Sequence, residues 1–315
     1  MARERLFAAC APGLEPLLAA ELGALGLEAR AVPGGAEAGG EDAVALACIG
    51  SRLADAVSLR LHAGPASGLA AAQAEARRRL GPGVELVARR GGGETTLSAD
   101  AAGGPLYRRG WRARVGPAPL RETLAAAMLA FAGWRGEGPF LDPMCGSGTL
   151  AIEAALLAAR RAPGRDRRFA FEDWPGHDPP RTAAVRARLA AAERPPPCAI
   201  HASDANGGAA RLAKKNAEAA GVAAWVRIER GDAAALQPPP GKGLCAVNPP
   251  WGGRLGGDPA EAWKALAALL SRLAGWRLVA VAPDRGLESH LGIAPARSLE
   301  TRSGGRACRL LAYDL

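Results

Sequence analysis

Apolar positions in the first hundred residues alternate between short runs and a helical spacing. Five leucines recur at helical intervals: Leu14, Leu17, Leu18, Leu22 and Leu25. They predict a helix over 13–25, and similar spacing predicts helices over 51–61 and 70–80. Short apolar runs predict strands over 5–9, 44–49, 84–87 and 95–98, with a glycine-rich stretch over 33–40. This is an α+β pattern without residues that indicate catalysis.

The pattern changes near residue 120, where strands and helices begin to alternate. We expect strands over 140–141, 198–203, 226–229, 244–247, 278–282 and 307–313, and helices over 120–131, 150–160 and 207–220. A further helix begins at 258–261, where Asp258 is an N-cap, Pro259 fits the first helical position and Glu261 completes a capping box. The alternation predicts an α/β fold with a mostly parallel, doubly wound sheet, which binds ligands at the carboxyl ends of its strands.

The length of 315 residues suggests about two domains. We expect an α+β domain over 1–104, a basic linker with a helix over 105–135, and the α/β domain over 136–315. A proline- and arginine-rich insertion over 162–197 interrupts the last of these.

Charge separates the two halves of the chain. The net charge is +9, from 40 basic and 31 acidic residues. Residues 1–104 hold 10 basic and 12 acidic side chains, so 105–315 carry 30 and 19, a net of +11. The excess fits a polyanionic partner. Arginines mixed with aromatics in 105–135 suit phosphate contact and base stacking, and the candidate RNA-binding residues are Arg108, Arg109, Trp111, Arg112 and Arg114. The alternative is a solvated basic linker.

Several classes of protein are disfavoured. No apolar run approaches the 18 or more residues of a membrane span, and the first ten residues lack the apolar core of a signal peptide. The six cysteines are scattered without a CxxC pair, which argues against zinc or a disulfide framework. We therefore expect a cytoplasmic protein without a metal or a membrane partner.

A glycine-rich turn follows the strand over 140–141, in the sequence Asp142-Pro143-Met144-Cys145-Gly146-Ser147-Gly148-Thr149. Gly146 and Gly148 allow a tight turn and a close approach of a ligand. The turn lacks the lysine of a Walker A loop and the spacing of a dinucleotide fingerprint. Alone, it is equally typical of a generic strand–helix connection.

Two acidic residues end the next two strands. Asp204 at the second strand could accept hydrogen bonds from both hydroxyls of a ribose, and Asp232 at the third could accept one from an adenine amine. Each alone is more typical of a turn residue or helix cap. Their order after the glycine-rich turn favours a cofactor that contains adenosine.

The sharpest signal is Asn248-Pro249-Pro250-Trp251, directly after a buried strand. The side-chain oxygen of Asn248 and the carbonyl of Pro249 could both accept hydrogen bonds from one amino group and orient its lone pair. Trp251 could stack on the base that carries the amine. The alternative is an Asn-Pro turn beside a core tryptophan.

Three motifs resemble one known family. The runs LDPMCGSGTLAIEAA and NPPWG resemble motifs I and IV of class I S-adenosylmethionine-dependent N-methyltransferases, and APLRETLAAAM over 118–128 resembles their motif X helix. The likeness is greatest to bacterial 23S rRNA guanine-N2 methyltransferases with a THUMP-containing N-terminal region. It extends to RLFAACAPGLEPLLAAELGALG at the N-terminal side, GGPLYRRGWR before the catalytic domain, and APGRDRRFAFEDWPGHD in the insertion.

The resemblance implies a Rossmann-like methyltransferase domain and a shortened, ferredoxin-like or THUMP-like domain over 1–104. It implies S-adenosylmethionine as the cofactor, RNA as the partner and no metal. The implied cofactor-binding residues are Thr123, Asp142, Pro143, Cys145, Gly146, Gly148, Thr149, Asp204, Asp232 and Asn248. The implied catalytic residues are Asn248, Pro249, Pro250 and Trp251, with Trp251 on a flipped-out guanine.

Two departures from the family leave alternatives open. Trp251 stands where the family usually has tyrosine or phenylalanine, so the identity of the base is less fixed. The N-terminal region is shortened around 63–93 and slightly acidic, which fits poorly with a strong RNA clamp. The leading prediction is methylation of guanine N2 in 23S rRNA. The alternatives are a tRNA guanine-N2 methyltransferase, a DNA adenine-N6 methyltransferase, and a non-catalytic RNA-binding or ribosome-assembly protein.

Overall fold

The computed structural model describes residues 4–91, 93–112, 120–251, 259–283 and 285–315. The chain divides into two compact units. Unit 1 comprises Met1–Tyr107 and Ala162–Ala192, and unit 2 comprises Arg108–Arg161 and Glu193–Leu315. The insertion over 162–197 was expected within the α/β domain, but its residues 162–192 pack with the N-terminal residues. The N-cap and capping box expected at Asp258 begin outside the described residues.

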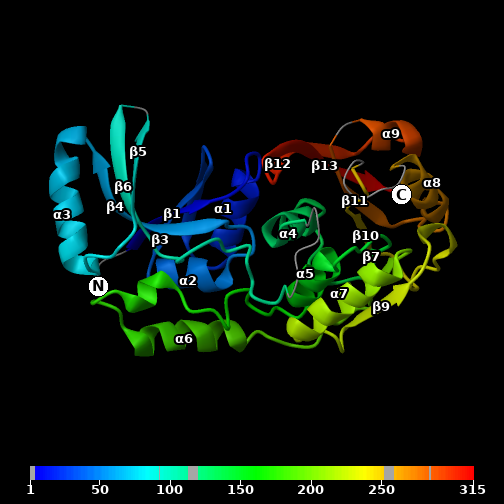
Figure 1. The fold of residues 1–315 in the computed structure, drawn as a ribbon, viewed down its shortest axis with the longest axis horizontal. Helices are drawn as coiled ribbons and strands as arrows, with labels where there is room; N and C mark the ends of the chain where they lie inside the picture. Colours follow the sequence, from blue (N-terminus) through cyan, green and yellow to red (C-terminus); the bar gives the residue numbers. More distant parts are fainter. Residues whose placement is uncertain (1–3, 92, 113–119, 252–258, 284) are drawn as a thin grey trace. The chain divides into compact units, whose positions relative to one another are not determined.

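Unit 1 begins with a βαββαβ order around an antiparallel sheet (Figure 1). Its elements are β1 (Glu4–Ala9), α1 (Glu15–Ala24), β2 (Glu28–Val32), β3 (Gly35–Gly40), α2 (Ala43–Gly50) and β4 (Ala56–Gly64). A short 3-10 turn η1 (Ala66–Gly68), α3 (Leu69–Leu80), β5 (Leu86–Gly91) and β6 (Glu94–Asp100) follow. The sheet order is β2-β3-β1-β4-β6-β5, so β1 lies between β3 and β4, as in a ferredoxin-like arrangement.

Two sequence predictions in unit 1 were wrong. Residues 44–49 form helix α2 instead of a strand, and much of 51–61 lies in strand β4 instead of a helix. The glycine-rich stretch contains strand β3. Every α2 residue from Ala43 to Ile49 is buried, so no amphipathic period distinguishes a helix from a strand there. This position of the strand requires glycine, because a Cβ at Gly35 would meet Ala8 O at 2.0 Å.

Arginines hold the insertion together within unit 1. The insertion contains a 3-10 turn, η2 (Ala170–Asp173), and helix α6 (Pro179–Ala190). Arg186 donates to the carbonyls of residues 164, 165 and 167 and forms an ion pair with Glu172 at 2.7 Å. Arg167 donates to the carbonyls of residues 102, 104 and 105. These arginines therefore bind the chain's own backbone.

Unit 2 is the doubly wound α/β unit that the sequence predicts (Figure 1). Its first elements are α4 (Glu122–Phe131), β7 (Phe140–Asp142), α5 (Thr149–Ala158), β8 (Ile200–Asp204), α7 (Gly207–Ala219) and β9 (Val226–Arg230). Then follow a short turn η3 (Ala233–Ala235), β10 (Leu244–Val247), α8 (Pro259–Leu270), β11 (Arg277–Ala282), α9 (Gly286–Leu291), β12 (Arg297–Ser303) and β13 (Arg306–Asp314).

The strand order is β12-β13-β11-β10-β7-β8-β9, and the five strands from β11 to β9 run parallel. The chain moves outward from β7 through β8 to β9, then returns to β10 on the other side of β7. Ligands bind at the carboxyl ends of strands at such a switch point. The ends of β7 and β10 carry Asp142 and Asn248.

A hairpin of β12 and β13 closes the far edge of this sheet. The sequence predicted β13 but missed β12, whose side chains are mostly exposed and give no alternating signal. Ser303 pairs with Arg306 across a two-residue turn, Gly304-Gly305, with φ of 55° and 87°. Positive φ at both positions is typical of a type I′ turn, so the Gly-Gly pair was the overlooked signal.

Candidate functional site

The glycine-rich turn after β7 is held by backbone contacts to the next strand and helix. Cys145 N–H donates to Ser203 O at 2.9 Å, and Gly148 N–H donates to Cys145 O at 2.7 Å. The side-chain amide of Asn216, a fully buried residue of α7, donates to Ser147 O at 2.9 Å. The turn is therefore fixed before any ligand binds, which lowers the entropic cost of binding.

The two glycines of the turn serve different purposes. Gly148 has φ of +84°, and a side chain there would come within 3.0 Å of the Ala213 side chain on α7. Gly148 is thus required for the packing of α5 against α7. Gly146 has φ of +53°, and a side chain there would meet nothing within 4 Å. The open space is at Gly146, where a ligand could approach the backbone.

Asp142 is a buried carboxyl group with unused hydrogen-bonding capacity. Its residue is 1% exposed, and Oδ1 accepts a hydrogen bond from Met144 N–H at 3.3 Å. Among the residues that the structure describes, Oδ2 has no donor. Burial, and secondarily the charge of Asp204, raises the pKa of Asp142 well above its usual range. A buried acceptor without a donor is costly, so a ligand that donates here would stabilise the site.

Asp204 joins the turn to the end of β8. Its Oδ2 accepts from Gly146 N–H at 2.8 Å, and its Oδ1 accepts from Asn206 N–H at 2.8 Å. The turn role that the sequence left open is therefore present in the structure. A carboxylate has about four lone-pair sites, so both oxygens keep capacity for a ribose hydroxyl.

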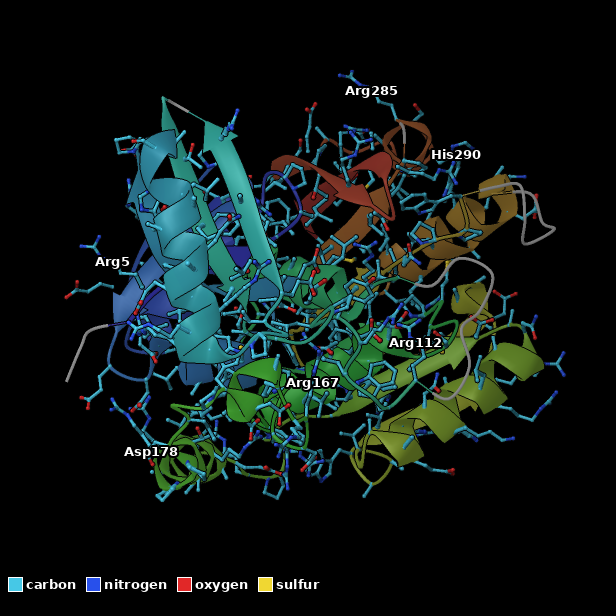
Figure 2. All side chains as sticks on the ribbon, turned by 60° about the vertical axis from the view of Figure 1, so that its left-hand side comes forward. Arg5, Arg112, Arg167, Asp178, Arg285 and His290 are labelled. Atoms are coloured by element: carbon cyan, nitrogen blue, oxygen red, sulfur yellow. The ribbon has the colours of Figure 1, made fainter. Side chains whose placement is uncertain are left out.

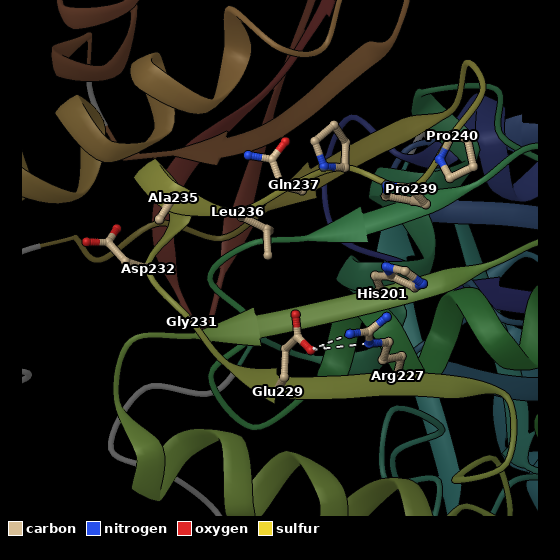
Figure 3. A pocket seen from close by; sticks show the side chains of 11 residues that line it. His201, Arg227, Glu229, Gly231, Asp232, Ala235, Leu236, Gln237, Pro239 and Pro240 are labelled. Carbon is tan, nitrogen blue, oxygen red and sulfur yellow. Dashed lines mark hydrogen bonds and ion pairs between the residues drawn. The ribbon is translucent and has the colours of Figure 1, made fainter.

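Asp232 lies after β9 and borders a pocket of about 480 Å³. Its Oδ1 accepts from Ala234 N–H at 2.9 Å, the capping contact that the sequence left open. Figure 3 shows its carboxylate pointing away from His201 and from the Arg227–Glu229 ion pair, whose nearest atoms lie 3.1 Å apart. Asp232 is exposed and lies on the same edge of the sheet as Asp204, which leaves its other oxygen accessible to a ligand.

The segment Asn248-Pro249-Pro250-Trp251 follows β10, the strand beside β7. Pro249 is buried and Asn248 is half-buried. Within the described part of the chain, the Asn248 side chain has no hydrogen-bond partner. Because β7 and β10 are parallel neighbours, Asn248 and Asp142 lie at the same edge of the sheet. An amide with free capacity thus stands beside the cofactor-type turn.

Trp251 is half-buried, and its indole carries two further features. The indole Nε1–H is buried and finds no acceptor in the part of the chain that the structure describes. The guanidinium carbon of Arg306 lies 5.6 Å from the centroid of the indole. Arg306 comes from the β12–β13 hairpin, so sequence reasoning, which missed that hairpin, also missed this residue.

The segment before α4, which the sequence predicts to bind RNA, is partly buried in the structure. The Arg109 side chain is 4% exposed and forms an ion pair at 3.3 Å with Glu153, which is 0% exposed. Trp111 is buried as well. The side chains of Arg109 and Trp111 are therefore buried in unit 2, unlike the exposed side chains that the RNA-binding prediction requires. Of the remaining predicted contacts, Arg108 is exposed and Arg114 lies outside the described residues.

Arg112 connects three segments around the glycine-rich turn. Its guanidinium donates to Glu122 Oε1 at 3.0 Å, to Leu120 O at 2.9 Å and to Thr149 Oγ1 at 3.0 Å. It therefore joins the start of α4 to the first residue of α5, directly after the glycine-rich turn. Thr123, the neighbour of Glu122, is buried in the first turn of α4. The polar contacts of Arg112 are therefore within the protein.

Two features are absent from the residues that the structure describes. No helix there is long and apolar enough to cross a membrane. No group of three or more histidine, cysteine, aspartate or glutamate side chains is placed to hold a metal ion.

Comparisons with known proteins agree with this geometry. Residues 109–312 match the family described as RMKL-like, methyltransferase domain, and residues 5–58 match the RlmL ferredoxin-like domain. A Pseudomonas aeruginosa protein named ribosomal RNA large subunit methyltransferase K/L is 38% identical over 253 residues, 75% of this chain and 35% of its own length. A protein of the same name from Methylococcus capsulatus is 38% identical over 237 residues, 70% and 32% of the two chains.

The chain spans between a third and three fifths of the length of the curated relatives it matches. Among solved structures, the protein SMU.472 in complex with SAH aligns with a TM-score of 0.88 at 22% identity, over 100% of this chain and 98% of that one. TrmN from Thermus thermophilus aligns with a TM-score of 0.70 at 22% identity, over 99% and 100% of the chains. These similarities confirm the fold of both units.

The family match covers about two thirds of the sequence and includes the glycine-rich turn, the acidic strand ends and the Asn-Pro-Pro-Trp segment. The chain therefore belongs to the RMKL-like methyltransferase domain family and carries an RlmL ferredoxin-like domain at its N-terminal side.

Proposed function

We propose that this chain transfers a methyl group from S-adenosylmethionine to an exocyclic amine of a base in RNA, namely guanine N2 in 23S rRNA. One observation carries the proposal. The amide of Asn248 and the buried carboxyl group of Asp142 lie at the same sheet edge, and among the described residues neither the amide nor Asp142 Oδ2 has a hydrogen-bond partner. The names of the relatives, ribosomal RNA large subunit methyltransferases, support rRNA as the substrate.

The cofactor-binding residues fit the proposed group. The Oδ2 of Asp142 suits the methionine amino group, and the open space at Gly146 admits the ligand to the backbone of the turn. The remaining capacity of Asp204 and Asp232 suits ribose hydroxyls and an adenine amine. Pro143, Cys145, Gly148, Thr149 and Thr123 shape the turn and its surroundings. When bound, S-adenosylmethionine supplies an electrophilic methyl group on a sulfonium.

The Asn-Pro-Pro-Trp segment would hold the acceptor amine. Asn248 Oδ1 and the Pro249 carbonyl accept hydrogen bonds from the two amine protons, which leaves the nitrogen lone pair free for attack. Pro250 restricts the backbone so that both acceptors keep their positions. Trp251 stacks on a base that has left its helix. The amine loses a proton after the new bond forms, so a strong general base is not required.

The remaining expectations belong with this proposal. A chain that modifies rRNA acts in the cytoplasm, where ribosomes are assembled, and its partner is the rRNA itself. Residues 1–104 contribute less to RNA capture than the methyltransferase unit, in line with their net charge of −2 (10 basic and 12 acidic residues).

Labelled methyl transfer tests the proposal and its alternatives. Purified protein is incubated with tritiated S-adenosylmethionine in three separate reactions, which contain rRNA, tRNA or DNA from cells that lack the protein. The nucleic acid is then digested, and the modified nucleosides are identified by mass spectrometry. We expect N2-methylguanosine in 23S rRNA. N2-methylguanosine only in tRNA, or N6-methyladenine in DNA, would assign the corresponding alternative. Binding of rRNA without methylation of any substrate would favour the assembly-protein alternative.

A further inference from the structure

The β12–β13 hairpin places one arginine on the proposed base-stacking residue. The guanidinium carbon of Arg306 lies 5.6 Å from the Trp251 ring centroid. Arg306 is exposed, and within the described residues it has no ion pair and no side-chain hydrogen bond. Its contact with the indole is therefore the one interaction that holds its side chain in this part of the structure.

The other three arginines of the hairpin have polar partners. Arg297 donates to Phe131 O. Arg302 donates to Gly305 O at 2.6 Å and braces the turn. Arg309 forms an ion pair with Glu288 and lowers the pKa of that carboxyl group below its usual range. Because these three have intramolecular roles, they do not explain why a fourth arginine faces Trp251. An unpaired guanidinium on an aromatic face is a group available for a planar, anionic ligand.

The turn that presents Arg306 has a defined geometry. Gly304 and Gly305 adopt positive φ, and the type I′ turn they form keeps Ser303 opposite Arg306. Arg306 is therefore the first residue of β13 and projects from a fixed position. Trp251 follows two prolines after β10, which restrict the backbone before it. Both residues belong to unit 2.

We propose that Arg306 forms the second wall of the base-binding slot. In the free protein its guanidinium covers Trp251, and on binding the target base enters between the two groups. The base is then stacked on the indole on one face and on the guanidinium on the other, while the positive charge is close to the flanking phosphates. This inference rests on the proposed function and names a substrate-binding residue that the resemblance to the family did not supply.

The observed distance is consistent with a closed slot. A base between two planar groups needs two layers of about 3.5 Å, or about 7 Å in all. The guanidinium at 5.6 Å must therefore move outward by roughly 1–2 Å, which a change of side-chain rotamer can supply. No rearrangement of the sheet is required.

Two substitutions and a control test the role. We compare Arg306→Ala and Arg306→Lys with Arg285→Ala, which removes one exposed arginine of the same unit that projects outward in Figure 2. The first measurement is binding of 23S rRNA at fixed salt. The second is steady-state methylation of the RNA that the wild-type chain modifies, with KM and kcat determined separately. Affinity for S-adenosylmethionine is measured alongside.

Arg306→Ala is expected to weaken RNA binding and raise KM for RNA about tenfold, with unchanged affinity for the cofactor. Arg306→Lys keeps the charge but loses the planar surface, so it should recover less than half of that loss on a logarithmic scale. Arg285→Ala should change either quantity less than about threefold. The inference is wrong if Arg306→Ala matches Arg285→Ala in RNA binding, or if lysine restores wild-type binding. If the wild-type chain methylates no RNA, while its RNA binding still depends on Arg306, the proposed function is wrong and the role of Arg306 in binding stands.

Discussion

Two places in the methyltransferase unit combine an arginine with a tryptophan, and they differ in what else surrounds the arginine. Arg112 lies 5.5 Å from the Trp111 ring, and Arg306 lies 5.6 Å from the Trp251 ring. The Arg112 side chain is 11% exposed and faces Glu122, whose side chain is 5% exposed. Arg306 is exposed and faces no carboxylate among the described residues. The distance from the guanidinium carbon to the ring centroid is nearly the same in the two pairs. Burial and a carboxylate partner therefore distinguish a structural arginine from a ligand-binding one.

The difference has an energetic basis. Burying a carboxylate and a guanidinium is costly, and the pair is tolerated because each neutralises the other. At Glu122, burial raises the pKa and the Arg112 charge acts in the opposite direction. Removing one partner therefore affects folding. An exposed arginine on an aromatic face contributes little to folding and remains available to a polyanion.

The largest expected effect is on the buried pair. Arg112→Met leaves Glu122 buried without its cation and should lower the free energy of unfolding by about 3–5 kcal/mol. Urea unfolding of the full chain measures the loss. The double variant Arg112→Met, Glu122→Gln should recover most of it, because no buried charge is then unpaired. Stability of the single variant equal to wild type would mean that the pair does not hold α4 and α5 together.

Arg306→Ala should separate the two arginines most clearly. Its free energy of unfolding should stay within about 0.5 kcal/mol of wild type, since it removes an exposed side chain. The same variant should lose about tenfold in affinity for 23S rRNA. Urea unfolding and RNA binding on one preparation give both values. A large loss of stability with unchanged RNA binding would make Arg306 a structural residue like Arg112.

A smaller effect is expected from pH at Asp142. Burial raises the pKa of its carboxyl group, so the free protein retains a proton at a pH where an ordinary carboxyl group has lost it. A bound ammonium group favours the ionised form, so binding releases a proton and affinity rises as pH rises through the raised pKa. Calorimetry of S-adenosylmethionine binding over a pH series that starts in the usual titration range of a carboxyl group should show tighter binding as the pH rises. Asp142→Asn should bind more weakly and without that pH dependence; wild-type affinity that falls with rising pH would contradict the assignment.

The smallest effect is expected at Arg108, the exposed arginine of the segment before α4. As one phosphate contact at most, Arg108→Ala should weaken RNA binding about twofold to threefold and lower the salt slope by about 1. RNA affinity measured at several salt concentrations tests this. A loss of RNA affinity larger than that of Arg306→Ala would mean that the main RNA contact lies in the segment before α4, as the sequence suggested.

Sequence reasoning succeeded where a local signal and the fold agree. The glycine-rich turn, Asp204, Asp232 and Asn248 all lie at strand ends of the predicted sheet. These positions could be predicted because the turn residues that separate strands from helices are recognisable in the sequence. The same reasoning assigned both Gly146 and Gly148 to ligand approach. Only three-dimensional packing shows that Gly148 is required by Ala213 on α7.

Burial caused the remaining errors. Helix α2 is buried on all sides, so its residues show no period that distinguishes it from a strand. Strand β12 is mostly exposed, so it lacks an apolar face and was missed together with Arg306. Arg109 and Arg112 pair with Glu153 and Glu122, which are 44 and 10 residues away in the chain. Only the folded structure shows which carboxylate an arginine meets.

Methyl transfer by Asn248→Ala tests the central claim most directly. Wild-type protein and the variant are compared for incorporation of labelled methyl into 23S rRNA, with S-adenosylmethionine affinity and RNA binding as controls for folding. The account predicts a loss on the order of 10²–10³-fold in methylation, because the amine is no longer oriented, with RNA binding nearly unchanged and cofactor affinity altered only modestly. Full methylation by Asn248→Ala would contradict the assigned role of this residue and the proposed mechanism.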